Sequence, residues 1–259
     1  MTRPAKPVAL VTGGRRGIGL GIAKALAAAG FDIAIVDIAE PGPPEDASPI
    51  GQLRSYGIEP LYLHADLADV EGHRATVEQA LAHFGRLDCL VNNAGMSSVL
   101  RGDFLDLEPA NFDAVMATNL RGTVFFTQAV ARAMLGQEAQ GPRSIINITS
   151  VSAALSSPER LDYCISKAGL ASFTQGLALR LAGHGIAVFE VRPGIIRTDM
   201  TAAVAAKYDT LIDGGLVPMR RWGEAADVGA ICASLATGAF AFATGSVINA
   251  DGGLSLGSL

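Results

Sequence analysis

Cysteine and histidine are scarce in this chain of 259 residues, which contains three cysteines and four histidines. Cys89, Cys164 and Cys232 are too few and too scattered for a disulfide framework or a zinc site. The histidines are equally dispersed and form no set of metal ligands. We therefore expect no metal ion, and we expect a reducing, cytoplasmic location.

Charge is also sparse: charged residues make up 17% of the chain, and 20 basic residues face 25 acidic ones, giving a net charge of −5. A nucleic-acid-binding protein would need a clustered basic surface, so we expect no nucleic-acid partner. The basic start MTRPAKP is not followed by the apolar core of a signal peptide. Residues 228–250 carry no charge, but Ser, Thr, Gly and Asn residues interrupt them, so we expect helix, loop and buried strand there and no membrane association.

What the chain does have is apolar residues, 49% of the total, arranged in short runs that alternate with helical stretches. The patterns predict strands at 8–12, 32–37, 59–66, 87–95, 144–150, 186–194 and 245–253, and helices at 17–30, 71–85, 112–135, 163–181 and 226–236. Apolar strands separated by helices indicate a parallel sheet covered on both faces. Right-handed crossovers then make this an α/β fold: one Rossmann-type, doubly wound sheet of about seven strands. We expect a single domain over 1–259, with a polar, proline-rich loop at 41–49 and a flap at about 197–222.

A glycine-rich turn joins the first strand to the first helix as Thr-Gly-Gly-Arg-Arg-Gly-Ile-Gly, which places glycines at Gly13, Gly17 and Gly19. Glycines let the backbone approach a pyrophosphate, and the helix N-terminus adds unpaired N–H groups and partial positive charge. The spacing differs from the common G-x-G-x-x-G fingerprint, and such a sequence alone is also compatible with a plain turn. Its place between a strand and a helix favours a dinucleotide site.

Acidic residues end the second and third strands at Asp37 and Asp66. A carboxylate at the end of the second strand accepts hydrogen bonds from the adenosine ribose hydroxyls and repels a 2′-phosphate. Asp66 either meets the adenine amino group or caps the following segment. Arg15 and Arg16 argue the other way, because a guanidinium pairs well with a 2′-phosphate. We give Asp37 more weight, so NAD is favoured over NADP.

Tyr163 and Lys167 lie at i and i+4 on a predicted helix, so that the phenol and the ammonium project from one face. A cation near the phenol is expected to lower its pKa toward the working pH. Ser150 ends the fifth strand, where a hydroxyl can hold a carbonyl oxygen or cap the next segment. Asn119, in the middle of a predicted helix, either has a functional role or bonds to backbone.

Together with the glycine turn, Asn92-Asn93-Ala94-Gly95 and Pro193-Gly194, these residues resemble the short-chain dehydrogenase/reductase family from Val8 to Gly253. The resemblance implies that Tyr163 is the general acid/base, that Lys167 lowers its pKa and holds the nicotinamide ribose, and that Ser150 orients the carbonyl. It also implies that Asn119 positions a water linking Lys167 to solvent. The implied cofactor residues are Gly13, Arg15, Arg16, Gly17, Ile18, Gly19, Asp37, Asp66, Leu67, Asn93, Ala94, Gly95, Tyr163, Lys167, Pro193, Gly194, Ile196 and Thr198.

Within the family, length and the Thr-Asp-Met-Thr sequence after Pro-Gly-Ile-Ile-Arg most resemble 3-oxoacyl-acyl-carrier-protein reductases. Those reductases usually prefer NADPH, so Asp37 is a departure. We therefore expect an NAD(H)-dependent oxidoreductase acting on a free small molecule, a secondary alcohol or polyol and its ketone. The alternatives are a carrier-protein reductase and an inactive dinucleotide-binding sensor. The resemblance also implies a homotetramer.

Residues around the predicted active site leave two questions open. The flap is amphipathic through Met200, Tyr208, Leu211, Leu216, Met219 and Trp222. These side chains either cover a substrate or hold the flap on the body. Glu159 and Arg160 either meet a polar substrate or face only solvent.

Overall fold

The computed structural model describes residues 6–41, 48–202 and 204–257. The predicted loop at 41–49 and the basic start fall largely outside these residues. The described residues form one seven-stranded sheet in the order β3-β2-β1-β4-β5-β6-β7, and every neighbouring pair is parallel. The strands are β1 Val8–Thr12, β2 Asp32–Asp37, β3 Leu61–His64, β4 Cys89–Asn92, β5 Arg143–Ile148, β6 Ile186–Pro193 and β7 Val247–Ala250. The predicted doubly wound α/β fold is confirmed.

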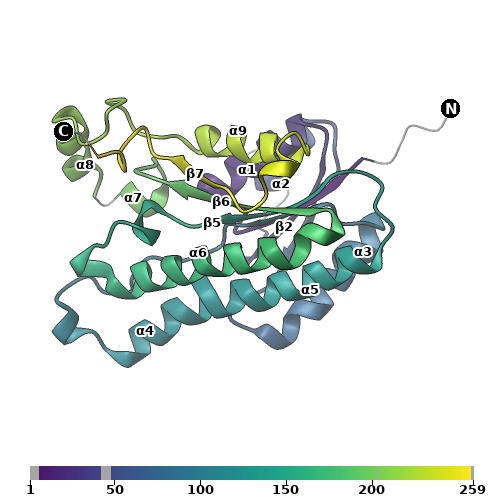
Figure 1. Cartoon of the computed structure of the whole chain (residues 1–259), viewed down its shortest axis with the longest axis horizontal. Helices are drawn as coiled ribbons and strands as arrows, with labels where there is room; N and C mark the ends of the chain where they lie inside the picture. The colour runs from purple at the N-terminus through teal and green to yellow at the C-terminus, as the bar shows by residue number, and fades with distance from the viewer. Residues whose placement is uncertain (1–5, 42–47, 203, 258–259) are drawn as a thin grey trace.

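Helices cover both faces of the sheet (Figure 1). One layer contains α1 Gly17–Ala28, α2 Pro49–Arg54 and α9 Ala225–Ala236, and the other contains α3 His73–Phe84, α4 Pro109–Met116, α5 Thr123–Gly136 and α6 Leu161–Leu181. Two short helices, α7 Asp199–Ala202 and α8 Ala205–Asp213, stand at one end of the molecule. Single 3-10 turns occupy Val70–Gly72, Phe104–Asp106, Val151–Ala153, Pro158–Arg160, Ala182–His184 and Ala241–Ala243.

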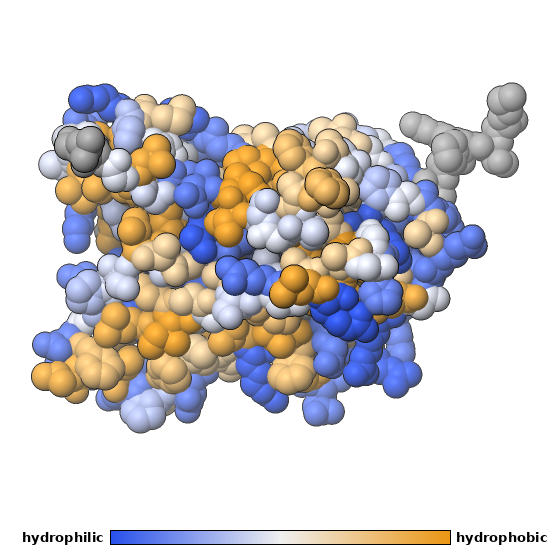
Figure 2. Space-filling model, viewed as in Figure 1, coloured by the Kyte–Doolittle hydropathy of each residue, from blue (hydrophilic) through white to orange (hydrophobic). Residues whose placement is uncertain are grey.

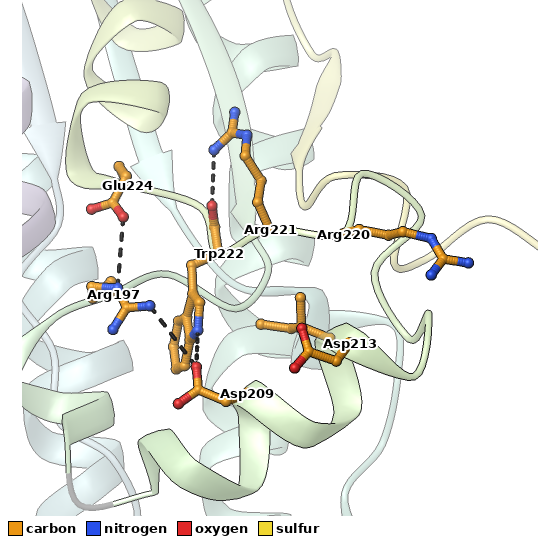
Figure 3. A pocket seen from close by; sticks show the side chains of 8 residues that line it. Arg197, Asp209, Asp213, Arg220, Arg221, Trp222 and Glu224 are labelled. Atoms are coloured by element: carbon orange, nitrogen blue, oxygen red, sulfur yellow. Dashed lines mark hydrogen bonds and ion pairs between the residues drawn. The ribbon is translucent and has the colours of Figure 1, made fainter.

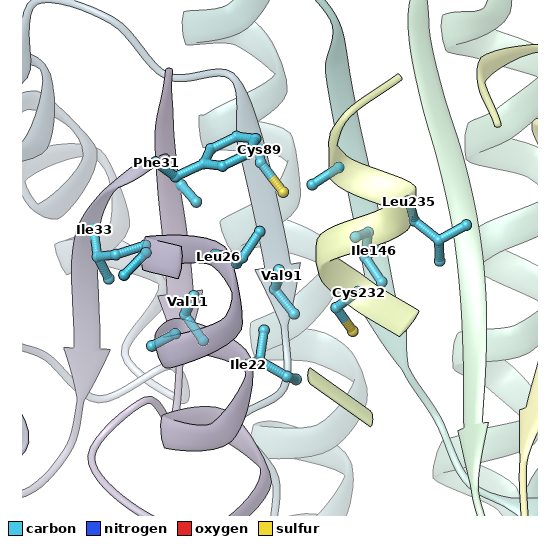
Figure 4. Close-up of a cluster of buried hydrophobic side chains, with 14 of the residues drawn as sticks. Val11, Ile22, Leu26, Phe31, Ile33, Cys89, Val91, Ile146, Cys232 and Leu235 are labelled. Carbon is cyan, nitrogen blue, oxygen red and sulfur yellow. The ribbon is translucent and has the colours of Figure 1, made fainter. Parts of the chain in front are cut away.

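Two apolar cores lie on the two faces because side chains alternate along each strand. On β1, Ala9 and Val11 pack toward α1 and α9, whereas Val8 and Leu10 pack toward α3, α5 and α6. Figure 4 shows the first core, where Ile22 and Leu26 of α1 and Cys232 and Leu235 of α9 pack on the same face of the sheet. Burying both faces of the strands explains why they are apolar almost throughout.

The long helix predicted at 112–135 is divided in the structure. A π-helical stretch, Ala117–Gly122, separates α4 from α5, which ends at Gly136. A Cβ on Gly122 would lie 2.3 Å from the Leu67 carbonyl oxygen, so the wider turn brings this backbone directly against the segment after β3. Such bulges occur mostly at functional sites, and the residue carried on this one is Asn119.

Sequence patterns missed the helices α2, α7 and α8 and overextended the third strand, which spans Leu61–His64. In α2 only Leu53 is buried, so no helical period is visible; its start is set instead by the Ser48 hydroxyl, which accepts a hydrogen bond from the Gly51 amide at 3.0 Å. Across the described ranges, no helix combines the length and apolar character that a membrane span requires.

Candidate active site

A cavity of about 640 Å³ opens at the carboxyl ends of the strands. Ligands of doubly wound folds bind at this edge, and the volume lies in the usual range for small-molecule sites. All but two of the predicted site residues line it. Those lining it are Gly13, Arg16, Gly17, Ile18, Gly19, Asp37, Asp66, Leu67, Asn93, Ala94, Gly95, Ser150, Tyr163, Lys167, Pro193, Gly194, Ile196 and Thr198. Arg15 and Asn119 are not among the lining residues.

The glycine turn has the backbone shape that its sequence predicts. Gly13 and Gly17 have φ angles of 63° and 53°, in the region that favours glycine. A Cβ on Gly19 would lie 2.1 Å from the Gly13 carbonyl oxygen, so no other residue fits there. Asn93 holds the turn in place, because its side-chain amide donates to the carbonyls of Thr12 and Gly13 at 3.0 and 3.1 Å.

The N-terminus of α1 begins inside this turn, and no side chain of the described residues caps it. Its first turn also carries no acidic residue. The unpaired amides and the positive end of the helix dipole are therefore directed to an anion that would enter the cavity. Together with the narrow glycine cradle, this arrangement fits the pyrophosphate of a dinucleotide.

Carboxylates lie against both arginines that favour NADP, and Asp37, at the end of β2, is the partner of Arg15. Its carboxylate accepts hydrogen bonds from the amides of Arg15 at 3.2 Å and Ala39 at 3.1 Å. The Arg15 guanidinium also lies against Asp37, with Nε 3.9 Å from a carboxylate oxygen. Arg16 pairs with Asp199 of α7 at 3.3 Å. Both arginines therefore face a carboxylate of this chain.

Asp66 fits both of its predicted interpretations. One carboxylate oxygen accepts a hydrogen bond from the Ala68 amide at 2.8 Å, which caps the turn after β3. The residue also lines the cavity, followed by the buried Leu67. The capping bond leaves the other carboxylate oxygen available at this end of the cavity.

Tyr163 and Lys167 project from α6 into the cavity near the end of β5. The Lys167 side chain is buried, its Nζ donates to the Ile148 carbonyl at 3.1 Å, and it lies 5.7 Å from the centre of the Tyr163 ring. Burial lowers the pKa of Lys167 to about 8.

The expectation that the phenol pKa is lowered is wrong for this structure. Burial raises the pKa of Tyr163 and outweighs a hydrogen bond with Ser150 and the charges of Arg160 and Arg101, which act in the opposite direction. Ser150 also caps the 3-10 turn Val151–Ala153, its hydroxyl accepting from the Ser152 amide at 3.0 Å. Burial therefore favours the neutral form of the phenol over the phenolate.

The Asn119 side chain bonds to backbone, and its role in positioning a water stays a prediction. Its side chain accepts from the Met96 amide at 2.8 Å and donates to the Met96 carbonyl at 2.9 Å and the Ser166 hydroxyl at 3.2 Å. A Cβ on Gly95 would approach both the Asn119 oxygen, at 3.1 Å, and Lys167 Nζ, at 3.5 Å. Asn119 thus fixes the segment after β4 against the helix that carries Tyr163 and Lys167.

The segment after β6 forms the opposite wall. Gly194 donates to the Ala250 carbonyl at 3.0 Å, and a Cβ there would lie 2.7 Å from that of Asp251. Ile196 is buried and pairs with Gly223. Thr198 then passes over Gly17, which brings the flap above the glycine turn.

Some apolar side chains of the flap face the cavity, where they can cover a substrate, and others hold the flap on the body of the protein. Met200, Tyr208 and Leu216 line the cavity, whereas Trp222 is buried and fastens the flap. Figure 3 shows the Trp222 indole between Arg197 and Asp209, whose carboxylate accepts from the indole N–H at 2.7 Å. Leu211 and Met219 are exposed and do not line the cavity.

Arg101 lines the cavity but was not singled out from the sequence. It lies in the loop after β4, and a basic residue in a loop at the carboxyl end of a strand is the sequence signal that points to it. Arg160, left open between substrate and solvent, also lines the cavity. Among the described residues, no group of three or more His, Cys, Asp or Glu side chains is arranged to hold a metal ion.

Comparison with known proteins agrees with this geometry. Residues 13–255 match the family described as enoyl-(acyl carrier protein) reductase. The chain is 36% identical to a 2-dehydro-3-deoxy-D-gluconate 5-dehydrogenase of Dickeya dadantii, over 95% of this chain and 94% of that protein. It is also 36% identical to a 3-oxoacyl-[acyl-carrier-protein] reductase of Synechocystis sp., over 98% of this chain and 99% of that one.

Among solved structures, a 3-oxoacyl-[acyl-carrier protein] reductase from Brucella melitensis in complex with NAD superposes with a TM-score of 0.95. It shares 65% identity and covers 99% of this chain and 100% of that one. The match extends over the strands, the glycine turn and the helix bearing Tyr163 and Lys167. The chain belongs to the short-chain dehydrogenase/reductase family.

Proposed function

We propose that the protein is an NAD(H)-dependent oxidoreductase that interconverts a secondary alcohol or polyol and its ketone. The observation that carries this proposal is the meeting of Ser150, Tyr163 and Lys167 in the same cavity as the glycine turn. An inactive dinucleotide-binding sensor would not need this set. Membership of an oxidoreductase family supports the catalytic alternative.

In this proposal Tyr163 is the general acid/base, whose phenol donates a proton to a ketone oxygen or accepts one from an alcohol. Ser150 holds the same oxygen, and the Lys167 ammonium bonds to the ribose beside it. Asn119 is a positioning residue that acts through the segment after β4. A bound nicotinamide supplies or accepts the hydride at the substrate carbon.

The preference for NAD over NADP rests on Asp37. A 2′-phosphate would have to lie against this carboxylate, whereas ribose hydroxyls can donate to it. Arg15 and Arg16, the cations able to compensate, are already paired with Asp37 and Asp199. The bound NAD of the similar Brucella structure supports the same choice.

Reduction of a carrier-bound 3-oxoacyl group is the second candidate, favoured by the names of the Synechocystis and Brucella proteins. An acidic carrier would be attracted by basic residues beside the cavity mouth. Arg143 is the first residue of β5, so it lies at the amino ends of the strands, away from the cavity. Its guanidinium donates to the carbonyls of Met134 and His184. With a net charge of −5, we expect weak steering toward such a carrier and prefer the free small molecule.

The test compares kcat/KM for carrier-linked acetoacetyl with that for a panel of free alcohols, polyols and ketones, using both cofactors at low salt. Turnover of free substrates is expected to exceed that of the carrier substrate. Tyr163→Phe is expected to lower turnover by about 10² to 10⁴-fold while NADH binding is retained. Efficient carrier reduction that falls steeply with added salt would favour the second candidate, and a Tyr163→Phe variant of near-normal turnover would remove the proposed acid/base.

We also propose that the protein assembles as a homotetramer through α5, α6 and the β7 edge. Exposed apolar side chains on and near these elements support it, among them Phe125, Ile165, Leu179, Phe242 and Val247. Figure 2 shows apolar side chains over α6 and β7 on the face turned to the viewer. The three cysteines are free thiols and buried, which fits the proposed cytoplasmic location.

A further inference from the structure

Two arginines and one lysine are the charged residues at the substrate end of the cavity, namely Arg101, Arg160 and Lys167. The acidic residues that line the cavity lie elsewhere: Asp37 and Asp66 follow β2 and β3, and Asp199 pairs with Arg16 above the glycine turn. Positive and negative side chains therefore line different parts of the cavity, and the positive part surrounds Tyr163. That end fits an anionic ligand group.

Arg160 lies over the ring of Tyr163, the proposed acid/base. It stands immediately before α6, its guanidinium lies 5.2 Å from the centre of the Tyr163 ring, and one terminal nitrogen donates to the Ser152 hydroxyl at 3.3 Å. The side chain is half-buried, yet it forms no ion pair with any carboxylate in the described part of the chain. The Ser152 bond uses one of the five N–H donors of a guanidinium, so most of the fork is available.

Arg101 comes to the same place from a different segment. The Gly102 amide donates to the Glu159 carbonyl at 3.3 Å, which ties the loop after β4 to the turn that ends in Arg160. Within residues 6–41, 48–202 and 204–257, the Arg101 side chain has neither a hydrogen bond nor an ion pair. Its charge nevertheless acts on the Tyr163 phenol, as does that of Arg160. Two guanidinium groups without acidic partners thus face one reacting centre.

We propose that the substrate of this enzyme carries a carboxylate, which Arg160 binds together with Arg101 while the reacting carbon lies at Tyr163. The substrate pair is then a hydroxy acid and its oxo acid. The planar fork of a guanidinium matches the two oxygens of a carboxylate, and a ligand anion supplies the partner that the chain does not. This inference rests on the proposed oxidoreductase function and narrows its substrate class.

The experiment compares each acid with an uncharged analogue of the same length. Acetoacetate and 4-oxopentanoate are assayed beside their methyl esters and carrier-linked acetoacetyl, with NADH and with NADPH, in the wild type and in Arg160→Gln, Arg160→Lys and Arg101→Gln. Arg74→Gln removes an equivalent charge from an exposed ion pair on α3 and is the matched control. Binding of pentanoate and pentanamide, measured by calorimetry, gives a second readout that needs no turnover.

We expect kcat/KM for the better acid to exceed that for its ester by at least about tenfold, and Arg160→Gln to lose roughly 10- to 100-fold on the acid only. Arg160→Lys should recover part of the loss, Arg101→Gln should show a smaller loss, and Arg74→Gln should show none. Pentanoate should bind more tightly than pentanamide to the wild type, and this difference in affinity should disappear in Arg160→Gln.

Equal use of acids and esters, an equal effect of Arg160→Gln on both, or equal binding of pentanoate and pentanamide would overturn the inference. So would a loss confined to carrier-linked acetoacetyl, which would assign the two arginines to an acidic carrier. If pentanoate binds through Arg160 but no compound is turned over with either cofactor, the anion site stands and the proposed function fails.

Discussion

Asp37 is the residue on which our proposed cofactor preference rests, because it lines the cavity at the end of β2 and also holds the Arg15 backbone. We expect the wild type to use NAD(H) with a higher kcat/KM than NADP(H). In Asp37→Ser the ratio of kcat/KM for NAD(H) to that for NADP(H) should fall by roughly 10- to 100-fold, because the carboxylate that repels a 2′-phosphate is gone and Arg15 loses its partner. Asp32→Ser, at the opposite end of β2, is the control. A wild-type preference for NADPH would contradict the argument.

Lys167 combines a proposed functional role with a cost in stability. Its pKa is about 8 in the folded protein against an ordinary 10.5, so between these values the unfolded chain binds more protons than the native protein. The free energy of unfolding of the wild type should therefore rise with pH between about 8 and 10.5. Below pH 8 the lysine is charged in both states, and the native protein bears the full desolvation cost of the buried ammonium. Lys167→Met removes this dependence.

Between pH 7 and pH 9.5 the free energy of unfolding of the wild type should rise relative to that of Lys167→Met. The difference between the two proteins should therefore change by roughly 1 to 3 kcal/mol in favour of the wild type. Urea unfolding without cofactor at both pH values measures it, and Lys207→Met, at an exposed lysine on α8, is the control. Parallel changes in the Lys167 and Lys207 variants would show that burial does not set the protonation of Lys167.

At the scale of elements, α1 and α9 pack backbone to backbone through Gly21 and Gly229. A Cβ on Gly21 would lie 2.7 Å from Ala225, and one on Gly229 would lie 2.6 Å from the Gly21 carbonyl oxygen. This close contact seats α1, and with it the glycine turn, on the sheet.

Gly21→Ala should lower the free energy of unfolding by about 2 to 3 kcal/mol, because the helices must separate to admit the methyl group. Gly136→Ala is the matched control: it lies in the last turn of α5 with nothing within 4 Å of an added Cβ, and should be neutral or slightly stabilising. Denaturant unfolding of the two variants compares them. Similar changes in both would mean that the α1–α9 contact is not close packed in solution.

The whole molecule presents an apolar surface around α6 and β7 that a single copy leaves uncovered. Leu179 is 85% exposed, and Phe242 is fully exposed. Large apolar side chains exposed on one surface are typical of association between chains, which in soluble oligomers is usually symmetric.

Light scattering at micromolar concentration should give the mass of a tetramer for the wild type and a smaller species for Phe242→Asp. Leu105→Asp changes a leucine on the turn Phe104–Asp106 that is as exposed as Leu179, and it should leave the tetramer intact. A stable wild-type monomer would contradict the proposed assembly.

The sequence by itself determined the succession of strands and helices along the chain, the parallel sheet, and the position of Tyr163 and Lys167 on one face of a helix. These features depend on local signals: apolar runs covered on two faces, glycines that a turn demands, and the period of a helix. The same locality explains its errors. Nothing local marks the π-helical stretch at Asn119, whose wide turn is fixed by contact with Leu67 and Met96, and α2 has too few buried residues to show a period.

Only the tertiary structure decided how the charges are distributed within the site. It placed the Arg15 guanidinium against Asp37, raised the pKa of Tyr163 where a lysine four residues away predicts a lower one, and brought Arg101 beside Arg160. Each of these depends on burial or on segments distant in the chain that meet at one edge of the sheet. Charge interactions are set by distance and by the surrounding dielectric, and neither quantity is written in the spacing of residues along the sequence.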